Sequence, residues 1–539
     1  MKHVTSLVVG LSIVASLPAA EAVPTEWQTV AESTDFRATS SYDETVDLLR
    51  RLAATSPAIR LEFFGRSAAG RPLPLVVVSA RQSFTPEAAV RAGAPVLLIQ
   101  SCIHAGEVDG KDASLILLRD WTLERRSLPS DVVVLFVPIF NADGHERVSP
   151  FNRPNQDGPV EGMGFRTTAN GINLNRDHMR LASPEMRALI RLFNRWRPHL
   201  HVDNHVTNGS DHAWILTWIV SEPPLLHPAI HGWNQNHLSS VLKRVDETGH
   251  PNGPYVSLAD RTDPTRGIEW YPSRPRLSSE HFPLRNRASI TIEMHSYKPF
   301  RDRVMANHDF LVELISEMDQ AGEELVRAVG RAEADTVAMG RADAEASDVV
   351  IRWRLADNVD RLRWRPHDWV VEPSQVTGES YLRYLPGAVR EIEVGWRHAP
   401  SPELTLPRPR GYLVLAGWPQ IERMVAEHGL QAHRVVVDTE AELETIRVSE
   451  PVLASTPYQG ATMVEDFAIS RQLERRVVPA ASVWIPADQP DFEVAVQLFE
   501  PEASDSLLRW GMISTVFERK EYIGTATLEE QARQMLEHD

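Results

Sequence analysis

Short apolar runs alternate with amphipathic stretches over roughly the first 300 residues of the chain. Five of these runs are predicted as strands: residues 61–64, 73–79, 95–100, 132–139 and 290–293. The last three are apolar almost throughout, which is typical of strands buried on both faces of a sheet. The first two lie on either side of a turn at 65–71.

The helical stretches carry their own start signals. Ser41 and Glu44 have the spacing of a capping box, and apolar residues continue on one helical face to Leu52. Further segments are predicted as helices at 113–123 and 184–195, and as a strand at 200–205. Strands that alternate with helices predict an α/β domain on a mixed, largely parallel central sheet flanked by helices.

The pattern changes after residue 310. Apolar residues recur at helical spacing to Val329, and residues 331–348 are then rich in Ala, Asp and Glu. We interpret this change as a boundary between a first domain, 23–335, and a smaller α+β domain, 349–539. Within the second domain the expected elements are β-like runs at 349–355 and 390–396, a βαβ-like unit at 412–437 and a helix at 528–536.

The N-terminus has the features of a signal peptide. A short basic start precedes an uncharged apolar run at 5–17, and Ala20-Glu21-Ala22 offers small residues around a cleavage site. We therefore expect residues 1–22 to be removed and the protein to be exported, to a periplasm or outside the cell. No later stretch reaches the ~20 apolar residues that a membrane helix needs.

Composition narrows the partners. A formal net charge of −17 argues against non-specific nucleic-acid binding, which needs clustered Lys and Arg. Cys102 is the single cysteine, so an intrachain disulfide and a cysteine-based zinc site are both excluded. Charge and composition leave the oligomeric state undetermined.

Two candidate metal ligands follow the strand at 95–100. His104 and Glu107 are three residues apart, a spacing that turns both side chains the same way within one turn. A catalytic zinc takes three protein ligands and leaves one position to water. His205 is the third candidate because it stands at the carboxyl end of another predicted strand, where ligands converge in α/β sheets. His199 and His201 compete for this role, and alternation places His201 on the same face as His205.

Taken together, these residues and their order resemble a known family. The order is His104-x-x-Glu107, Asn175-Arg176, His205 and then Glu293, with Asn141-Ala142-Asp143-Gly144 and the turn Gly65 to Arg71 before them. This series is similar to the zinc carboxypeptidases of the carboxypeptidase A type, over roughly residues 42–303. It implies the fold of that family and an exported bacterial member with an extra C-terminal domain.

The resemblance also implies a role for each residue. One Zn²⁺ per chain would be held by His104, Glu107 and His205, and Glu293 would act as general base and acid. Asn175 and Arg176 would bind the free C-terminal carboxylate of a peptide substrate. Arg166 would stabilise the oxyanion, and Arg153 is the alternative candidate for this role. The reaction would release a single C-terminal residue from the peptide.

Two positions depart from the family pattern. Asn173 stands where the family has an aspartate that accepts a hydrogen bond from the first zinc histidine. The mobile tyrosine that caps the substrate has only one candidate, Tyr271, in surroundings unlike those of the family. The sequence therefore does not indicate which C-terminal side chain the enzyme would prefer. No motif in 349–539 points to chemistry. That this domain caps the catalytic cleft is a hypothesis.

The sequence therefore predicts a zinc-dependent metallocarboxypeptidase. One alternative keeps the metal and changes the substrate: an amidase or deacylase that acts on N-acyl amino acids or on peptidoglycan stem peptides. Another alternative is an inactive secreted binding protein on a peptidase scaffold, although the three ligand positions and Glu293 are all filled.

Overall fold

The computed structural model describes residues 22–207, 209–270, 274–341 and 343–538. The predicted signal segment, apart from Ala22, and Tyr271 lie outside the described residues. Among the helices that are described, none is long and apolar enough to cross a membrane.

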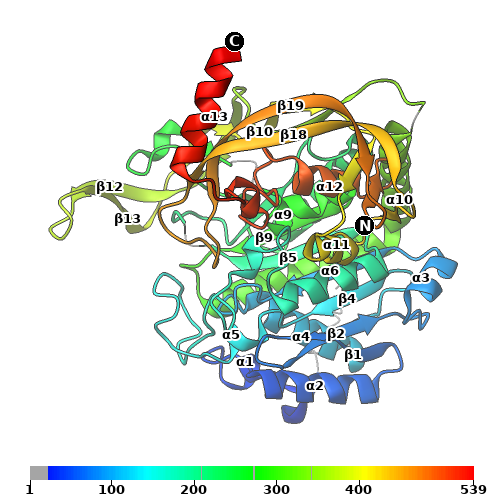
Figure 1. Ribbon diagram of the computed structural model, residues 1–539. Coiled ribbons are helices and arrows are strands. Elements are labelled where there is room, and N and C mark those ends of the chain that lie inside the picture. The colour runs from blue at the N-terminus through cyan, green and yellow to red at the C-terminus, as the bar shows by residue number, and fades with distance from the viewer. Residues whose placement is uncertain (1–21, 208, 271–273, 342, 539) are drawn as a thin grey trace, which may run out of the picture.

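An eight-stranded mixed sheet forms the centre of the first 300 residues, with strand order β1-β2-β4-β3-β5-β9-β6-β7 (Figure 1). Its strands are β1 (Ile59–Arg66), β2 (Pro72–Val78), β3 (Val96–Ser101), β4 (Val133–Val137), β5 (Leu200–Val206), β6 (Leu216–Val220), β7 (Asn252–Pro254) and β9 (Ala288–Met294). The four central strands β4, β3, β5 and β9 are parallel to one another. On one side β2 pairs antiparallel with β4 and with β1, and on the other side β6 pairs antiparallel with β9. The predicted α/β fold with a mixed, largely parallel sheet is confirmed.

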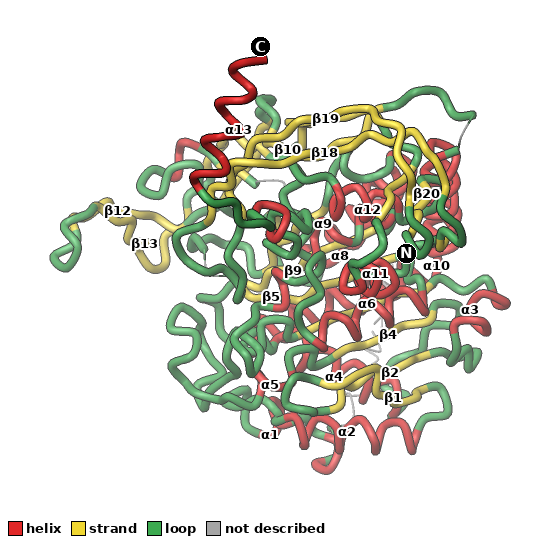
Figure 2. The backbone as a smooth tube through the Cα atoms, in the orientation of Figure 1, coloured by secondary structure: helices red, strands yellow, loops and turns green. Residues whose placement is uncertain are grey.

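Helices cover both faces of this sheet (Figure 2). The helices of this part of the chain are α1 (Val30–Ser33), α2 (Tyr42–Thr55), α3 (Pro86–Ala92), α4 (Asp109–Thr122), α5 (Ala142–His145), α6 (Pro184–Trp196), α7 (Pro228–Trp233), α8 (Ser239–Glu247), α9 (Ser278–His281) and α10 (Phe300–Gly340). Short turns complete the list: η1 (Thr25–Trp27), η2 (Leu174–Arg176), η3 (Asn234–Leu238), η4 (Pro264–Arg266) and η5 (Pro283–Arg285). Leu97 and Ile99 of β3 belong to the same apolar core as residues of α2, α4, α7, α8 and α10, whereas Val96 and Leu98 belong to a second core with residues of α3 and α6. The unbroken apolar run at 96–99 is typical of a strand that is buried on both sides in this way.

Helix α10 runs through the position where the sequence suggests a domain boundary. It extends to Gly340, so residue 335 lies inside a helix that begins on the central sheet. The Ala-, Asp- and Glu-rich composition that suggests a linker is equally suited to helix, since Ala and Glu have high helix propensity.

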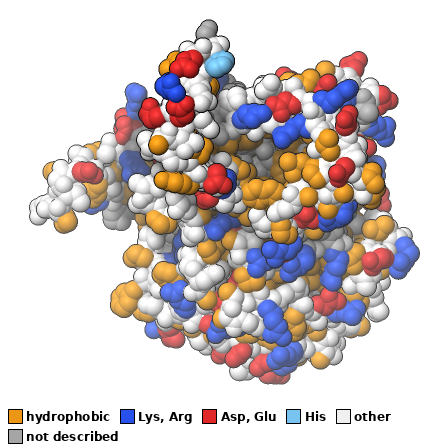
Figure 3. All heavy atoms as spheres, viewed as in Figure 1, with side chains coloured by type: hydrophobic (Ala, Val, Ile, Leu, Met, Phe, Trp, Pro, Cys, Tyr) orange, Lys and Arg blue, Asp and Glu red, His pale blue; other side chains and the backbone are white. Residues whose placement is uncertain are grey.

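The C-terminal region, residues 348–538, is made of paired strands with short helices. Its strands are β10 (Asp348–Leu355), β11 (Asp360–Trp364), β12 (His367–Pro373), β13 (Ser380–Val389), β14 (Ile392–Arg397), β15 (Pro400–Pro407), β16 (Gly411–Val414), β17 (His433–Arg434), β18 (Thr439–Leu453), β19 (Val464–Val478) and β20 (Val483–Pro486); its helices are α11 (Pro419–Glu427), α12 (Phe492–Phe499), η6 (Ser514–Phe517) and α13 (Thr525–His538). The predicted βαβ-like unit is present as β16, α11 and β17, with β20 inserted between the two strands. The hairpin β12–β13 and helix α13 stand out from the body of the molecule (Figure 3).

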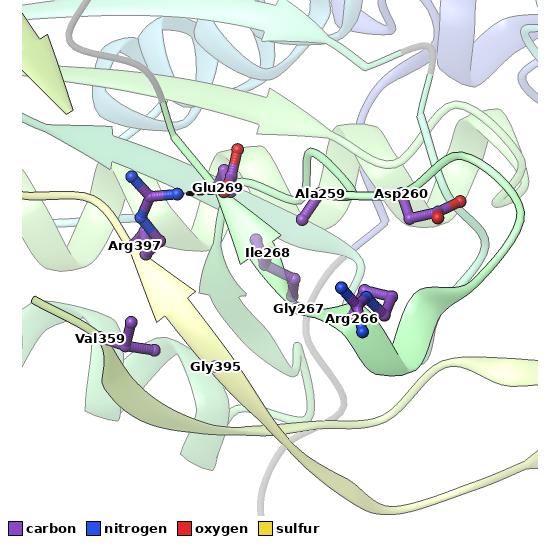
Figure 4. A pocket seen from close by; sticks show the side chains of 9 residues that line it. All are labelled: Ala259, Asp260, Arg266, Gly267, Ile268, Glu269, Val359, Gly395 and Arg397. Atoms are coloured by element: carbon purple, nitrogen blue, oxygen red, sulfur yellow. Dashed lines mark hydrogen bonds and ion pairs between the residues drawn. The ribbon is translucent and has the colours of Figure 1, made fainter. Parts of the chain in front are cut away.

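This region packs closely on the first part of the chain. Strand β14 pairs in parallel with β8 (Ile268–Glu269), and Arg397 forms an ion pair with Glu269 at 2.8 Å (Figure 4). Elsewhere Arg276 pairs with buried Asp505, with 2.6 Å between Nε and Oδ1. Met179 belongs to the apolar core of the C-terminal region. The two parts are therefore joined at several separate places.

Candidate metal centre

The first two candidate ligands lie in the loop between β3 and α4. The backbone N–H of Glu107 donates to the carbonyl of His104 at 2.9 Å, which folds the loop into one turn. Gly106 at its centre leaves no room for a side chain, because an ideal Cβ would lie 2.5 Å from the carbonyl oxygen of Gly164. The spacing His-x-x-Glu thus brings both side chains to one side of the loop, at the carboxyl end of the sheet.

The third candidate, His205, comes to the same place from β5. Its Nδ1 lies 2.9 Å from Oε2 of Glu107 and 3.2 Å from Nδ1 of His104. One ligand atom from each of the three residues lies within 4.8 Å of the others, and all three side chains are buried. Two imidazoles and a carboxylate in this arrangement form a donor set that suits zinc.

The other nitrogen of each ring is held by an outer partner. His104 Nε2 lies 3.1 Å from Oδ1 of Asn173, and His205 Nε2 lies 2.9 Å from Oδ2 of Asp203. The Asn173 oxygen also accepts the backbone N–H of Asn175 at 3.0 Å, so it is an acceptor and His104 Nε2 is the donor. The same reasoning makes His205 Nε2 a donor to the Asp203 carboxylate. Both rings therefore present Nδ1 toward Glu107, which makes Nδ1 the candidate ligand atom of each histidine.

Burial and nearby charges shift the pKa values of the two histidines in opposite directions. Burial lowers the pKa of His104 to about 4. Burial also acts to lower the pKa of His205, but the carboxylates of Asp203 and Glu107 outweigh it and hold that pKa well above the usual value. Burial acts to raise the pKa of Glu107, yet Arg153 and the two histidines keep it well below its usual value.

Glu293 stands beside the three candidate ligands on the neighbouring strand. It is opposite His205 in the parallel pairing of β5 with β9. Burial raises the pKa of the Glu293 carboxyl to about 7, and the charge of Glu107 acts in the same direction. A carboxylate with this pKa can accept and return a proton near neutral pH.

Two arginines approach the same carboxylate of Glu107. Arg153, the fallback choice, is buried and lies 2.8 Å from Glu107 Oε1, and it also donates to the carbonyl of Val206 at 3.0 Å. Arg166 is 3.6 Å from the same oxygen, and its side chain is 41% exposed. Arg166 is thus the one of the two that has access to solvent and to a bound molecule.

The pair Asn175-Arg176 lies in the turn η2, directly after Asn173. The amide oxygen of Asn175 accepts the backbone N–H of Ser278 at 2.9 Å, and its nitrogen lies 3.4 Å from His205 Nε2. Arg176 is partly exposed and acts electrostatically on Arg166. The turn brings both residues to the edge of the metal centre.

Comparisons with known proteins point to one family. Residues 45–210 match the model of the zinc carboxypeptidase family. The matched stretch belongs to the zinc carboxypeptidase family, and it contains the three candidate ligands. The chain is also 23% identical over 492 residues to carboxypeptidase 2 of Trichophyton rubrum, which covers 87% of this chain and 84% of that protein. Carboxypeptidase 2 of Trichophyton equinum is 22% identical with the same coverage.

Solved structures of metallocarboxypeptidases are similar at a lower level. The metallo-carboxypeptidase of Burkholderia cenocepacia has a TM-score of 0.38 and 17% identity, with 52% of this chain and 70% of that chain covered. Carboxypeptidase A of Helicoverpa armigera has a TM-score of 0.38 and 19% identity, with 55% and 75% covered. The prediction of the zinc carboxypeptidase family from ordered motifs is confirmed, and the chain is a metallocarboxypeptidase-type hydrolase.

The two remaining motifs, the turn at 65–71 and the Asn-Ala-Asp-Gly segment, are joined to each other and to Arg166 by hydrogen bonds. Asp143 accepts hydrogen bonds from Ser67 Oγ at 2.7 Å and from Ala69 N at 2.8 Å. Asn141 accepts from Gly144 N at 3.0 Å and donates to the carbonyl of Arg166 at 3.2 Å. The early turn and the Asn-Ala-Asp-Gly segment therefore lock together and carry the loop that bears Arg166.

The two histidines that compete with His205 lie outside the ligand group. His201 is not in the ligand group: it packs on Phe282 with ring centres 3.9 Å apart, and its Nδ1 lies 3.3 Å from Ser289 Oγ. His199 Nδ1 accepts the backbone N–H of Val96 at 3.0 Å. Tyr271 lies outside the described residues.

Tyr255 lies near the metal centre, although no sequence motif points to it. Burial raises the pKa of its phenol, and the charges of Glu293 and Glu107 add to that effect. It follows β7, which pairs with β6, and β6 in turn pairs with β9, the strand that carries Glu293. A tyrosine after an edge strand gives no sequence signal, because strand order cannot be read from the chain.

Proposed function

We propose that the protein is a zinc-dependent carboxypeptidase that releases the C-terminal residue of a peptide, with His104, Glu107 and His205 as the zinc ligands. The observation that supports this most directly is the convergence of the three ligand atoms within 4.8 Å beside Glu293. The family match over residues 45–210 supports the same reaction class.

The donor set fits one Zn²⁺ per chain. Both imidazoles have Nε2 engaged by an outer partner, so each has Nδ1 left for the metal. When bound, zinc supplies the Lewis acidity that makes a water molecule nucleophilic near neutral pH.

Glu293 is proposed as the general base and acid. Its carboxyl, with a pKa of about 7, takes a proton from water and returns it to the leaving amine. Its position opposite His205 on the adjacent strand keeps this carboxylate next to the ligands without making it one of them.

Recognition of the substrate is proposed for the turn η2 and Arg166. Arg176 suits a free C-terminal carboxylate because its planar guanidinium offers two parallel hydrogen bonds. Asn175 accepts a hydrogen bond from the backbone of Ser278, so we assign it the positioning of this turn together with a share in carboxylate binding. Arg166, exposed by 41% beside Glu107, is proposed to stabilise the oxyanion, and Tyr271 stays a prediction for the substrate cap.

Export and domain organisation remain part of the proposal. We propose a signal peptide at 1–22, a catalytic domain at 23–335 and a C-terminal α+β domain at 349–539. A periplasmic or extracellular location would supply peptides with free C-terminal carboxylates as substrates.

The decisive test combines metal analysis with one variant. The purified protein should hold about one zinc per chain and lose activity to a chelator, and Glu293→Gln should retain zinc while its kcat falls about 10²–10⁴-fold. Blocked dipeptides, N-acyl amino acids and muropeptides, compared side by side, separate a carboxypeptidase from an amidase. A protein that binds no zinc and hydrolyses none of the three would instead be an inactive binding protein.

A further inference from the structure

A tight turn of the C-terminal region reaches the metal centre. Residues 458–461 lie between β18 and β19, and Tyr458 and Ala461 exchange backbone hydrogen bonds of 2.8 and 3.0 Å. The two central residues, Gln459 and Gly460, have φ of 51° and 73°. Two residues with positive φ make a turn of the hairpin type that glycine and asparagine favour, so a glutamine at 459 carries a conformational cost.

The side chain of this glutamine is bonded to the residue that holds His104. Gln459 Oε1 accepts the backbone N–H of Asn173 at 2.7 Å. Asn173 is 6% exposed, and its own side-chain oxygen accepts from His104 Nε2 at 3.1 Å. A continuous series of hydrogen bonds therefore runs from the candidate zinc ligand through Asn173 to the C-terminal region.

Several contacts fix the turn where it is. Its backbone carbonyl at Gln459 accepts from Arg180 Nη1 at 2.5 Å. The ring of Tyr458 stacks on Trp510 with centres 6.0 Å apart, and Arg276 lies 5.4 Å above the Tyr458 ring. Arg276 is in turn paired with buried Asp505. The turn is thus attached to both parts of the molecule around Asn173.

We infer that the turn 458–461 contributes to zinc binding. Gln459 is a positioning residue that fixes Asn173 and thereby orients His104 for zinc. This inference rests on the proposed function, since it concerns zinc affinity. The catalytic domain supplies all three ligands, while the C-terminal region supplies the outermost support of one of them. Outer partners of metal-bound histidines act on affinity through the ring's orientation and tautomer.

The test compares variants of the full-length protein by zinc affinity, measured in competition with a chromogenic chelator. Gln459→Gly removes the acceptor and suits the positive φ, so the turn itself is not strained. We expect its zinc dissociation constant to rise about 10-fold, at the lower end of the effect of direct outer partners. Gln459→Asn also tolerates the conformation but is one methylene shorter, and it should weaken zinc binding similarly.

Gln459→Glu keeps an acceptor oxygen at the same reach and should stay within about threefold of the wild type. Gln472→Ala is the matched control, because Gln472 is an exposed glutamine on β19 of the same hairpin. The thermal midpoint of the metal-free proteins reports any general loss of folding. Equal zinc affinity in the wild type and in the Gly and Asn variants would overturn the inference, as would a Glu variant as weak as the Gly variant. A wild type that binds no zinc would overturn the proposed function itself.

Discussion

The two histidines of the metal centre are held by different regions of the molecule. His205 lies on β5 in the middle of the sheet, and its partner Asp203 is two residues earlier on the same strand. His104 lies in a loop, and its partner Asn173 lies in a second loop that is tied to the C-terminal turn at Gln459.

The difference shows two ways to orient a ligand. Along a strand, alternate side chains lie on one face, so β5 delivers His205 and a charged partner together. Asp203 is itself held by Ser278 Oγ at 2.6 Å and by Gln100 Nε2 at 3.2 Å. His104 and Asn173 lie in two loops, where no strand pairing fixes their side chains. Asn173 is held instead by a hydrogen bond to Gln459, which is distant in sequence. His104 thus has a neutral amide as its outer partner, whereas His205 has the carboxylate of Asp203.

Removing the charge on the His205 side should have the largest effect among the outer partners. Asp203→Asn keeps the shape of the side chain and removes the carboxylate that raises the basicity of His205, so zinc affinity should fall about 10–100-fold. Chelator competition measures the change. Asp47→Asn, an equal change of charge on exposed α2, is the control, and an identical effect of both variants would refute the special role of Asp203.

The two sides should also differ in the proton that zinc displaces. His104, with a pKa of about 4, is already neutral above pH 5, whereas the raised pKa of His205 keeps that ring protonated in the metal-free protein. Zinc binding should therefore release one histidine proton, and affinity should fall about tenfold for each pH unit below the pKa of His205. Calorimetry in buffers of different ionisation enthalpy counts the protons. The Glu293→Gln background removes the other group that titrates near neutral pH, and release of two protons at pH 6 would contradict the assignment.

Adding a charge on the His104 side should produce the smallest change, and in the opposite direction. Asn173→Asp gives His104 a carboxylate acceptor while its backbone N–H can still bond to Gln459, so zinc should bind a few-fold more tightly. Asn173→Ala, which removes the acceptor, should weaken binding. The same competition assay compares them, and an Asp variant weaker than the Ala variant would show that the charge costs more in burial than it contributes to ligation.

Much of the first 300 residues can be predicted from local pattern. The capping box at Ser41 and Glu44 predicts the start of α2, and both of its reciprocal hydrogen bonds are formed. The apolar run at 95–100 predicts β3, whose alternate residues enter the two cores on either side of the sheet. These predictions succeed because capping and burial leave signals within a few residues of each other.

The long-range parts could not be predicted in the same way. The pairing of Asn173 with Gln459 spans 286 residues, and that of Arg276 with Asp505 spans 229. Strands β18 and β19 have 15 residues each and are largely exposed, so they lack the apolar runs by which buried strands are recognised. The proximity of Tyr255 to Glu293 depends on strand order, which leaves no mark in the chain.

The α/β fold, the zinc carboxypeptidase family and the order of the candidate ligands all follow from local periodicity and short motifs in the chain. How those ligands are held follows from the folded arrangement. It placed His205 rather than His201 beside His104 and Glu107, assigned a charged partner to one histidine and a neutral partner to the other, and brought Gln459 to the neutral one. Hydrogen bonds between distant segments depend on how the chain packs. A glutamine in a turn therefore gives no indication in the sequence of which residue it will bond.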